Sequence, residues 1–486
     1  MASRFSGAIQ IANLDDFITP SQECIKPVEI QKEKPRTGSK IRIEEDGSYV
    51  NVSGDKVEKL ARVDITLADC LACSGCITTA ETVLVTQQSH EEMLRIFRNK
   101  EAVRSHYAFT DRLNGLRTGI VVVALEVLRS QLISRLIVNN NRLFRRLGAD
   151  MVLDIGLAED LALIEEFKEF TARYKRFVNG DKSALPMLAS TCPGWVCYTE
   201  KTKSHLLPNL SSCRSPQQIM GRLVKSHFSD RASPSEIYHV TLMPCYDKKL
   251  EASRTQFTIS DVRDVDCVVT PVEIVSLIKE VSGERGLASE DESDLDWPWE
   301  FLEKYQPLTR PAGSGSGGYA QHILAKFSKE MGIDEIPPFS NVKYDSIPQL
   351  YSSIIQNVCY STFQFFSRRV DMQMAHLQTL ELKIAVVTGF RNIQNLVNKM
   401  KRGTCDYHYV EVMACPTGCL NGGAQVKGQL KEVEGAYNDL PVRNVGDLLQ
   451  FYNKWFGDVN SPEVEQQLHT TFEAVTYNPN PLGIKW

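Results

Sequence analysis

The sequence of 486 residues predicts an α/β protein built on parallel β-sheets. From residue 116 onward, short runs rich in β-branched residues alternate with amphipathic segments of helix length, which is the pattern of βαβ units. A second series of the same kind begins at residue 383. In addition, the chain has 13 cysteines, and an odd number without a secretory signal favours thiolate ligation of metal over a disulfide framework.

The first series predicts five strands and three helices. Each strand is a short apolar run, and each helix repeats apolar residues every three or four positions. We expect the strands at residues 119–125, 151–154, 187–190, 237–243 and 267–270. We expect the helices at residues 129–147, 160–174 and 215–228.

The second series predicts strands at residues 383–388 and 409–413. A helix is expected from residue 391 and another near residues 445–455. Between the two series, residues 283–299 are dense in Glu and Asp, which predicts a solvated surface loop. The first 60 residues are polar and contain three prolines, which is typical of an arm or loop that wraps a small domain.

Composition excludes several classes of protein. Hydrophobic residues make up 42% and charged residues 24%, as in ordinary globular chains and unlike collagenous or disordered ones. The formal net charge of −5 argues against a surface dedicated to nucleic acid. The longest charge-free apolar run, residues 119–125, is far shorter than the roughly 20 residues that a membrane helix needs. Because residues 1–17 lack the apolar region of a signal peptide, we expect an intracellular protein.

Three cysteines near the N-terminus have the spacing of an iron–sulfur motif. Cys70, Cys73 and Cys76 form C-x2-C-x2-C, in which a tight loop turns three thiolates toward one cubane. A single cubane needs a remote fourth ligand, and Cys24 is the only cysteine upstream. Tetrahedral zinc is the alternative for this motif, since three thiolates and one further ligand also satisfy it. For Cys24 the alternative is a buried free thiol.

Four further cysteines are distributed over three loops that each follow a predicted strand. Ligand sites of open α/β sheets lie at the carboxyl ends of strands, so we expect these loops to converge in one crevice. The four thiolates would hold a second cubane, and they are Cys192, Cys245, Cys415 and Cys419. Cys197 follows Cys192 closely enough to be a substitute ligand. The other cysteines, Cys213, Cys267, Cys359 and Cys405, are expected to be small core residues.

The three loop peptides, at residues 191–195, 243–249 and 411–423, resemble the iron-only hydrogenase large-subunit family in sequence and order. The resemblance extends from about residue 90 to residue 455. It implies a fold of two doubly wound α/β lobes of that type with a cluster buried between them. It also implies that the four cysteines bind the cubane of the hydrogen-activating cluster, and that the position of Cys419 bridges to a two-iron subsite. Lys248 matches a lysine near that subsite.

One departure from this family bears on activity. True hydrogenases carry a proton-relay thiol immediately before the first cysteine ligand, and here that position is Thr191. A thiol with a pKa of about 8.5 exchanges protons near neutral pH, whereas an alcohol does not do so readily. The glycine run that follows Cys419 is also altered, to Gly-Gly-Ala-Gln at residues 422–425.

With one N-terminal cysteine motif and the relay thiol absent, the chain resembles a narrower group. These are the nuclear prelamin A recognition factor-like (Nar1-type) proteins of cytosolic iron–sulfur assembly. The resemblance implies a protein without hydrogenase activity that binds two [4Fe–4S] clusters. It further implies a link between a scaffold complex of P-loop NTPases and a targeting complex that inserts clusters into cytosolic and nuclear apoproteins. We therefore expect a cytoplasmic protein, with the nucleus as a second location.

The C-terminal residue, Trp486, is a candidate docking residue, because members of this group are similar in ending with tryptophan. An indole beside a free carboxylate is a compact peptide hook. Lys485 replaces the acidic residue that is common in such tails. The expected partner is the WD40-propeller component of the targeting complex. Neither a membrane nor a nucleic acid is expected as a direct partner.

These inferences divide the chain into five parts. A polar arm with a small ferredoxin-like iron–sulfur segment covers residues 1–88, and the two hydrogenase-like α/β lobes cover residues 89–282 and 301–457. The acidic surface loop lies between the lobes at residues 283–300, and a C-terminal helix and tail occupy residues 458–486.

The sequence is also compatible with two other functions, that of a true iron-only hydrogenase and that of a zinc-stabilised nuclear interaction protein. The motif Gly-Ser-Gly-Ser-Gly-Gly at residues 313–318 matches G-x-G-x-x-G, but the preceding residues contain two prolines and do not predict a strand. We therefore discount dinucleotide binding there. We expect instead a glycine loop close to the buried cluster, with backbone amides that hydrogen-bond sulfur.

Overall fold

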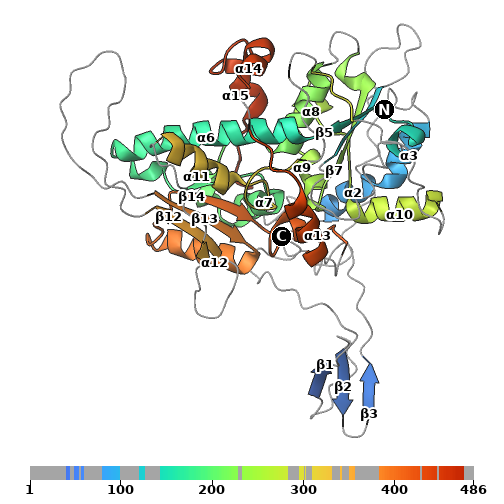
Figure 1. Cartoon of the computed structure of the whole chain (residues 1–486), viewed down its shortest axis with the longest axis horizontal. Coiled ribbons are helices and arrows are strands. Elements are labelled where there is room, and N and C mark those ends of the chain that lie inside the picture. The colour runs from blue at the N-terminus through green and yellow to red at the C-terminus, as the bar shows by residue number, and fades with distance from the viewer. Residues whose placement is uncertain are drawn as a thin grey trace, which may run out of the picture.

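Two β-sheets with helices on both faces form the body of the protein (Figure 1). The computed structural model describes residues 40–43, 49–53, 56–59, 79–98, 120–125, 143–227, 232–282, 295–299, 302, 309–330, 340–341, 350–355, 382–426, 430–445 and 448–475. A separate antiparallel sheet is formed by β1 (Lys40–Ile43), β2 (Tyr49–Ser53) and β3 (Lys56–Lys59). The predicted site residues Cys24, Cys70, Cys73, Cys76 and Trp486 lie outside the described residues.

The first large sheet consists of four parallel strands in the order β10-β7-β4-β5. Their bounds are Cys267–Val269 for β10, Ile237–Leu242 for β7, Ile120–Leu125 for β4 and Met151–Asp154 for β5. Ile237 of β7 enters one hydrophobic cluster, and Tyr238, Val240 and Leu242 enter a second cluster on the other face of the sheet. The strands predicted from β-branched runs are confirmed, and both faces are covered, as in a doubly wound fold.

Helices on opposite faces cover this first sheet. One face packs against α3 (His90–Arg98) and α10 (Pro271–Ser282), and the other against α6 (Gly156–Val178) and α8 (Pro216–His227). Helix α3 is strongly amphipathic: Met93, Ile96 and Phe97 are buried, while Glu91 is exposed. This arrangement confirms the helix that was expected at residues 215–228, and it extends the one expected at residues 160–174 by about one turn at each end.

The second large sheet is mixed and has the order β11-β12-β13-β14-β6. Three neighbouring strands are parallel to one another: β13 (Leu382–Thr388), β14 (Tyr409–Met413) and β6 (Met187–Leu188). Strand β12 (Leu350–Ile355) pairs antiparallel with β13 on one side and with β11 (Ser340–Asn341) on the other. Helices α7 (Pro193–Thr202) and α12 (Phe390–Lys401) cover one face, and α6 with α11 (Tyr319–Glu330) covers the other. The second βα series is thus confirmed.

Strand β6 connects the two halves of the fold. It lies within residues 89–282, which were assigned to the first lobe, yet it pairs with β14 of the second sheet, with Met187 opposite Tyr409. Helix α6 contributes to a single core cluster that includes residues of both sheets. The two sheets are therefore interleaved in the sequence and share one core between them.

The described end of the acidic segment differs from the solvated loop that its composition predicts. Trp299 is buried, with 1% of its surface exposed, and packs against Trp297. Asp296 accepts a hydrogen bond from Val152 N at 2.8 Å and forms an ion pair with Arg145 at 2.6 Å. Residues 295–299 are thus held against β5, because two tryptophans supply the apolar surface that the acidic residues lack.

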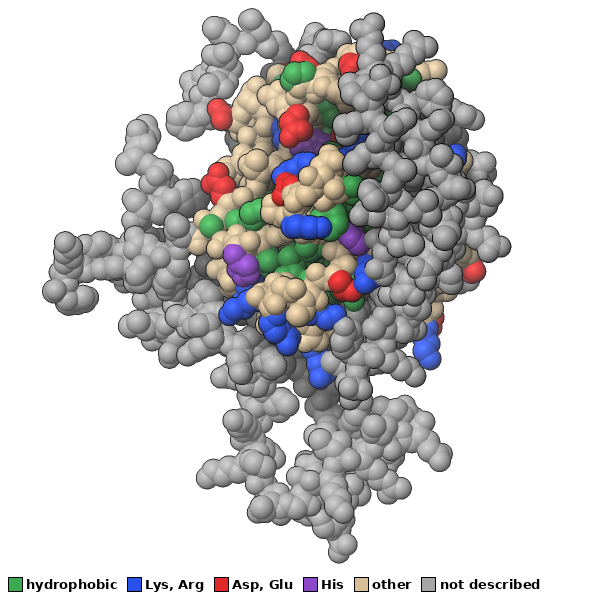
Figure 2. All heavy atoms as spheres, turned by 90° about the vertical axis from the view of Figure 1, so that its left-hand side faces the viewer, with side chains coloured by type: hydrophobic (Ala, Val, Ile, Leu, Met, Phe, Trp, Pro, Cys, Tyr) green, Lys and Arg blue, Asp and Glu red, His purple; other side chains and the backbone are tan. Residues whose placement is uncertain are grey.

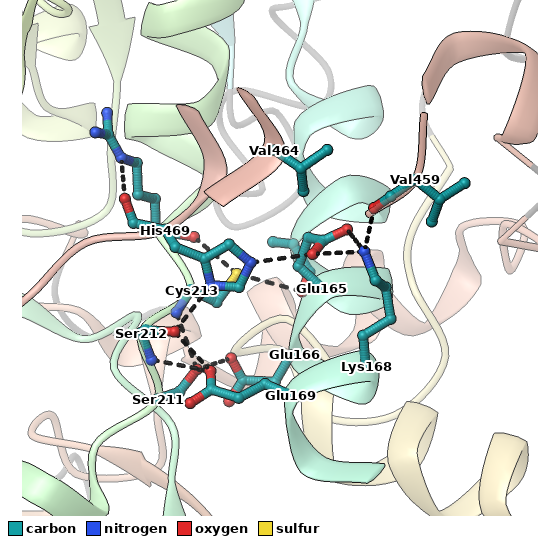
Figure 3. A network of polar contacts seen from close by, with 12 residues as sticks. Glu165, Glu166, Lys168, Glu169, Ser211, Ser212, Cys213, Val459, Val464 and His469 are labelled. Carbon is teal, nitrogen blue, oxygen red and sulfur yellow. Dashed lines mark hydrogen bonds and ion pairs between the residues drawn. The ribbon is translucent and has the colours of Figure 1, made fainter. Parts of the chain in front are cut away.

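The C-terminal part crosses the molecule and is fastened to α6 (Figures 1 and 3). It contains α13 (Leu430–Asp439), α14 (Leu449–Trp455) and α15 (Pro462–Leu468), and α14 confirms the helix expected near residues 445–455. His469 Nε2 lies 3.0 Å from Glu165 Oε2, and Lys168 Nζ donates to Val459 O at 2.9 Å. Beyond α15, Val475 N donates to Glu200 O at 3.1 Å, so this segment runs along α7.

Several shorter elements connect these layers. They are α2 (Thr79–Gln87), α9 (Asp247–Ala252), β8 (Thr258–Ile259), β9 (Val262–Arg263) and the 3-10 turns Lys182–Ala184, Ser204–Asn209, Pro234–Glu236 and Cys419–Asn421. Residues 143–147 are helical as well, at the described end of the helix expected at residues 129–147. In the part of the chain that the structure describes, no helix has both the length and the apolar content of a membrane span.

The face at the left of Figure 1 carries both signs of charge, with several basic side chains toward its lower edge (Figure 2). Exposed basic residues occupy the last turns of α6 and α12: Lys175 and Arg176 on α6, and Lys401 on α12. Cations at a helix C-terminus interact favourably with the helix dipole, typically by about 0.3–1 kcal/mol. These basic residues therefore contribute to the stability of the two helix ends.

Candidate functional site

A cavity at the carboxyl ends of strands from both sheets contains the four cysteines that the sequence analysis grouped together. It lies beside α7 and α9, which pack against each other near the centre of Figure 1. Its lining includes Thr191, Cys192, Cys245, Lys248, Ser316, Met413, Cys415 and Cys419. The structure thus brings the three predicted loops to one place, as expected for an open α/β sheet.

Cys192 and Cys245 are each placed by the start of a helix. Cys192 is the residue immediately before α7, and Pro193 occupies the first helical position, where its missing N–H costs nothing. The Sγ atom of Cys192 accepts a hydrogen bond from Ala414 N at 3.3 Å, which connects the first loop to the third. Cys245 follows β7 and precedes α9, and only 9% of its surface is exposed.

Cys415 and Cys419 lie in a tight loop after β14 that glycines make possible. Gly418 has a φ of 87°, and a Cβ atom there would lie 2.3 Å from Ser316 Oγ. A Cβ atom on Gly422 would lie 2.3 Å from the carbonyl oxygen of Pro244. Side chains at these two positions would force the loops apart, so both glycines are needed for the cysteines to meet.

The four thiols are close enough to influence one another electrostatically. Burial raises the pKa of Cys192 to about 12, and the neighbouring Cys419 adds to this rise. Burial also raises the pKa of Cys245 and of Cys415 well above the usual range, with further contributions from Asp247 and from the other cysteines. Four thiolates in this position therefore require a compensating positive charge, which a bound metal group supplies.

The glycine-serine loop at residues 313–318 forms another wall of the cavity. Ser316 Oγ accepts a hydrogen bond from Cys419 N at 3.1 Å. Glu411, which is fully buried in β14, accepts bonds from Ser314 Oγ at 2.5 Å and from Ala320 N at 2.8 Å. A glycine loop thus lies beside the site, as expected, and a strand carboxylate holds it in place. The hydrogen bonds expected from its backbone amides to sulfur stay a prediction.

Lys248 lies at the cavity as a buried cation with defined partners. Its Nζ atom donates to the carbonyl oxygen of Thr191 at 3.1 Å and to Glu251 Oε2 at 3.0 Å. Glu251 Oε2 also accepts from Ser215 Oγ at 2.8 Å. Lys248 thus braces the first loop against α9, and its charge is largely balanced by Glu251.

The remaining described cysteines lie elsewhere. Cys197 is in α7, but its Sγ accepts from Arg254 Nη2 at 3.4 Å and does not line the cavity. Cys213 and Cys267 are buried in the core, and Cys405 is partly buried after α12. The structure therefore does not bring the substitute ligand Cys197 to the site.

The four cysteines suit a metal cluster better than a single metal ion. Within the described ranges, no three His, Cys, Asp or Glu side chains are placed to hold a single metal ion. Instead, three loops bring the four cysteines together around one cavity. Four thiolates are the ligand set of a [4Fe–4S] cluster, so the residues present fit such a group.

Sequence reasoning missed several residues that complete this lining, among them Gln217, Tyr319 and Met413. Met413 precedes the Ala-Cys-Pro peptide directly, and Cys419 Sγ lies 4.0 Å from its Sδ atom. Its position at the end of a predicted strand was a usable signal. Tyr319 directly follows the glycine loop at residues 313–318, which was itself a usable signal. Gln217 lies near the start of α8, distant in sequence from the four cysteines, and nothing in its local sequence indicated the site.

Comparison with known proteins supports the class that fold and site define. Residues 137–423 match the family described as "Iron only hydrogenase large subunit, C-terminal domain". A solved [FeFe]-hydrogenase from Chlamydomonas reinhardtii superimposes with a TM-score of 0.63 over 77% of this chain and 98% of that chain. At 24% identity, this likeness shows the fold alone. The protein is thus of the iron-only hydrogenase-like class, and the predicted two-lobed α/β fold is confirmed.

Curated relatives narrow this class. The chain is 42% identical to the "Probable cytosolic Fe-S cluster assembly factor" of Culex quinquefasciatus over 510 residues, with 100% of both chains covered. It is 41% identical over 513 residues to the "Cytosolic Fe-S cluster assembly factor narfl" of Xenopus tropicalis, again over the full length of both. The chain belongs to this family of hydrogenase-like proteins, which confirms the resemblance inferred from the loop peptides.

Proposed function

We propose that this protein is a component of the cytosolic iron–sulfur protein assembly machinery and has no hydrogenase activity. The full-length similarity to proteins named cytosolic Fe-S cluster assembly factors supports the role and a cytoplasmic location. One observation of the site carries the proposal furthest. Four cysteines, two of them buried, converge in one cavity, while the position before the first of them is Thr191, whose hydroxyl does not relay protons at neutral pH.

In this proposal the protein holds two [4Fe–4S] clusters. Cys192, Cys245, Cys415 and Cys419 are the ligands of the second, buried cluster. The ligands of the first cluster are Cys24, Cys70, Cys73 and Cys76, which lie outside the described residues. A bound cluster supplies positive charge for the thiolates and, where redox-active, one electron. The chain's own contribution is to exclude water and to hold the thiols by three packed loops.

The partners belong to the same proposal. The protein links a scaffold complex of P-loop NTPases to the targeting complex that inserts clusters into cytosolic and nuclear apoproteins. Trp486 would dock on the WD40-propeller component of the targeting complex, and a nuclear fraction of the protein would accompany nuclear delivery. Deletion of Trp486 should abolish co-purification with the propeller and leave iron content unchanged. Retained co-purification would refute the docking role.

Depletion in cells tests the assembly role. Activities of cytosolic iron–sulfur enzymes should fall, while those of mitochondrial iron–sulfur enzymes persist, and the wild-type chain should restore the lost activities. Equal loss in both compartments would contradict the proposal.

Spectroscopy and metal analysis separate the other two functions. Infrared bands of iron-bound CO and CN in the purified protein would indicate a true hydrogenase. Zinc without acid-labile sulfide would indicate a zinc-stabilised interaction protein. We expect neither result.

Replacement of Cys70, Cys73 and Cys76 together should remove about half of the iron, because one of two cubanes is lost.

A further inference from the structure

One hydroxyl group at the cavity lacks the partner that burial demands. Thr191 is 7% exposed and lines the cavity, yet its Oγ1 atom has no hydrogen-bond partner among the described residues. Burying a hydroxyl without a hydrogen bond destabilises the folded protein. Native structures seldom leave such a group unpaired, so its acceptor is to be sought within the cavity.

Neighbouring polar groups on the cavity wall are engaged elsewhere. Gln217 Nε2 donates to Lys248 O at 3.1 Å, and Gln217 Oε1 accepts from Thr241 Oγ1 at 3.1 Å. Ser316 Oγ accepts from Cys419 N. Each of these groups therefore has at least one partner within the protein, and in this respect Thr191 Oγ1 differs from them.

The backbone of Thr191 is held firmly even though its hydroxyl is not. The carbonyl oxygen of Thr191 accepts from Lys248 Nζ at 3.1 Å, and the next residue is Cys192. A β-branched side chain has few accessible χ1 rotamers, so the orientation of the hydroxyl is restricted once the backbone is fixed. The loop that positions the thiol of Cys192 therefore also positions the hydroxyl of Thr191.

We propose that Thr191 Oγ1 donates a hydrogen bond to a sulfur atom of the group that the four cysteines hold. This inference rests on the proposed function, because it requires a cluster in the cavity. The hydroxyl keeps its proton at neutral pH and so acts as a permanent donor. A hydrogen bond to sulfur stabilises the more negative, reduced cluster and raises its reduction potential. Through this direct contact, Thr191 thus adjusts the reduction potential of the cluster.

The test compares two variants in full-length protein whose N-terminal motif is removed by C70A, C73A and C76A, so that the cavity cluster is observed alone. T191V keeps the shape of the side chain and removes the donor, whereas T191S keeps the donor. The midpoint potential is followed by electron paramagnetic resonance. Resonance Raman spectra in H2O and D2O give a second readout that needs no redox change. Iron content per folded chain is measured for each variant.

We expect T191V to retain its iron, to shift to a lower midpoint potential, and to lose the deuterium-sensitive component of the Fe–S stretching bands. T191S should behave like the parent in all three respects. Identical potentials and identical deuterium shifts in T191V and its parent would overturn the inference and would leave only a bound water as the partner. A parent protein without iron in the cavity would instead refute the proposed function, so the two failures are distinguishable.

Discussion

The cavity and the polar network on α6 are both buried, but they satisfy their polar groups in opposite ways. In the network, carboxylates of α6 meet donors supplied by the protein itself (Figure 3). Glu165 accepts from Lys168 Nζ at 2.9 Å and lies 3.0 Å from His469 Nε2, and the hydroxyl of Tyr452 donates to it as well. At the cavity, four thiols lie together, and the hydroxyl of Thr191 has no partner among the described residues.

The difference separates a structural site from one that is built for a ligand. Burying charge in the α6 network is tolerated because each carboxylate is hydrogen-bonded, and the network fastens the C-terminal segment to the core. At the cavity, burial and mutual repulsion raise the pKa of the thiols, so the protein alone does not stabilise their charged form. The cavity is therefore completed by something that the chain does not supply.

The largest expected effect comes from Glu165→Ala in the α6 network. Removal of this carboxylate leaves Lys168, Tyr452 and His469 without their buried partner, and breaking such a buried pair typically costs about 3–5 kcal/mol. Chemical unfolding should show this loss, while Lys175→Ala, an exposed position in the last turn of the same helix, should cost at most about 1 kcal/mol, the usual contribution of a cation to the helix dipole.

Iron content per folded molecule should be unchanged in Glu165→Ala, since none of its partners lines the cavity. If the folded variant lost its iron, the separation between structural network and ligand site would be wrong.

Gly422→Ala acts on the cavity instead. The new Cβ atom would lie 2.3 Å from the carbonyl oxygen of Pro244, so the second and third cysteine loops must separate. Overpacking of this kind costs about 1–3 kcal/mol, and bound iron should fall as well. The control is Gly435→Ala in α13, where no atom lies within 4 Å of the added Cβ. It should leave iron unchanged and raise stability by about 0.5–1 kcal/mol. Full iron retention in Gly422→Ala would contradict the described packing.

Glu166 gives the α6 network a pH dependence. Burial, with a smaller contribution from Glu169, raises the pKa of Glu166 from 4.5 to about 8. Ser211 Oγ lies 2.7 Å from Glu166 Oε2 and 2.7 Å from Glu169 Oε2, but a hydroxyl has only one proton to donate. One carboxyl group must therefore carry a proton, and we assign it to Glu166.

The folded protein thus binds one proton more than the unfolded chain between pH 4.5 and about 8. Stability falls as pH rises through this window, by at most about 1.4 kcal/mol per pH unit. Glu166→Gln imitates the protonated form, because its amide can donate to Ser211 Oγ. Unfolding curves at several pH values should show a flatter profile for this variant. A profile as steep as that of the wild type would show that Glu166 does not hold the proton.

Much of the fold followed from local patterns. Strands such as β5 and β14 are runs of β-branched and apolar residues whose burial on both faces fixes their type and bounds. The cysteine loops were found because Cys192, Cys245 and Cys415 each follow a strand, and strand ends of an open sheet meet at one crevice.

Other features depend on long-range contacts and could not be found this way. The pairing of β6 with β14 is set by tertiary packing, so the sequence alone did not predict that a strand within residues 89–282 joins the second sheet. Carboxylates on an amphipathic helix are usually solvent-exposed, so the sequence did not predict that those of α6 are buried. Their partners, among them Ser211 and His469, lie in segments that are distant in sequence. The burial of Trp299 within an acidic stretch has the same origin.

Iron and acid-labile sulfide, counted in anaerobically purified full-length protein, test the central claim most directly. The comparison is between the wild type, the double variant Cys245→Ala/Cys415→Ala, and Cys197→Ser, whose thiol contacts Arg254 away from the cavity. The double variant should lose about half of both iron and sulfide, because one of two cubanes is removed. Cys197→Ser should match the wild type. Unchanged iron in the double variant, or a loss in Cys197→Ser of the same size, would contradict the assignment of the cavity as a cluster site.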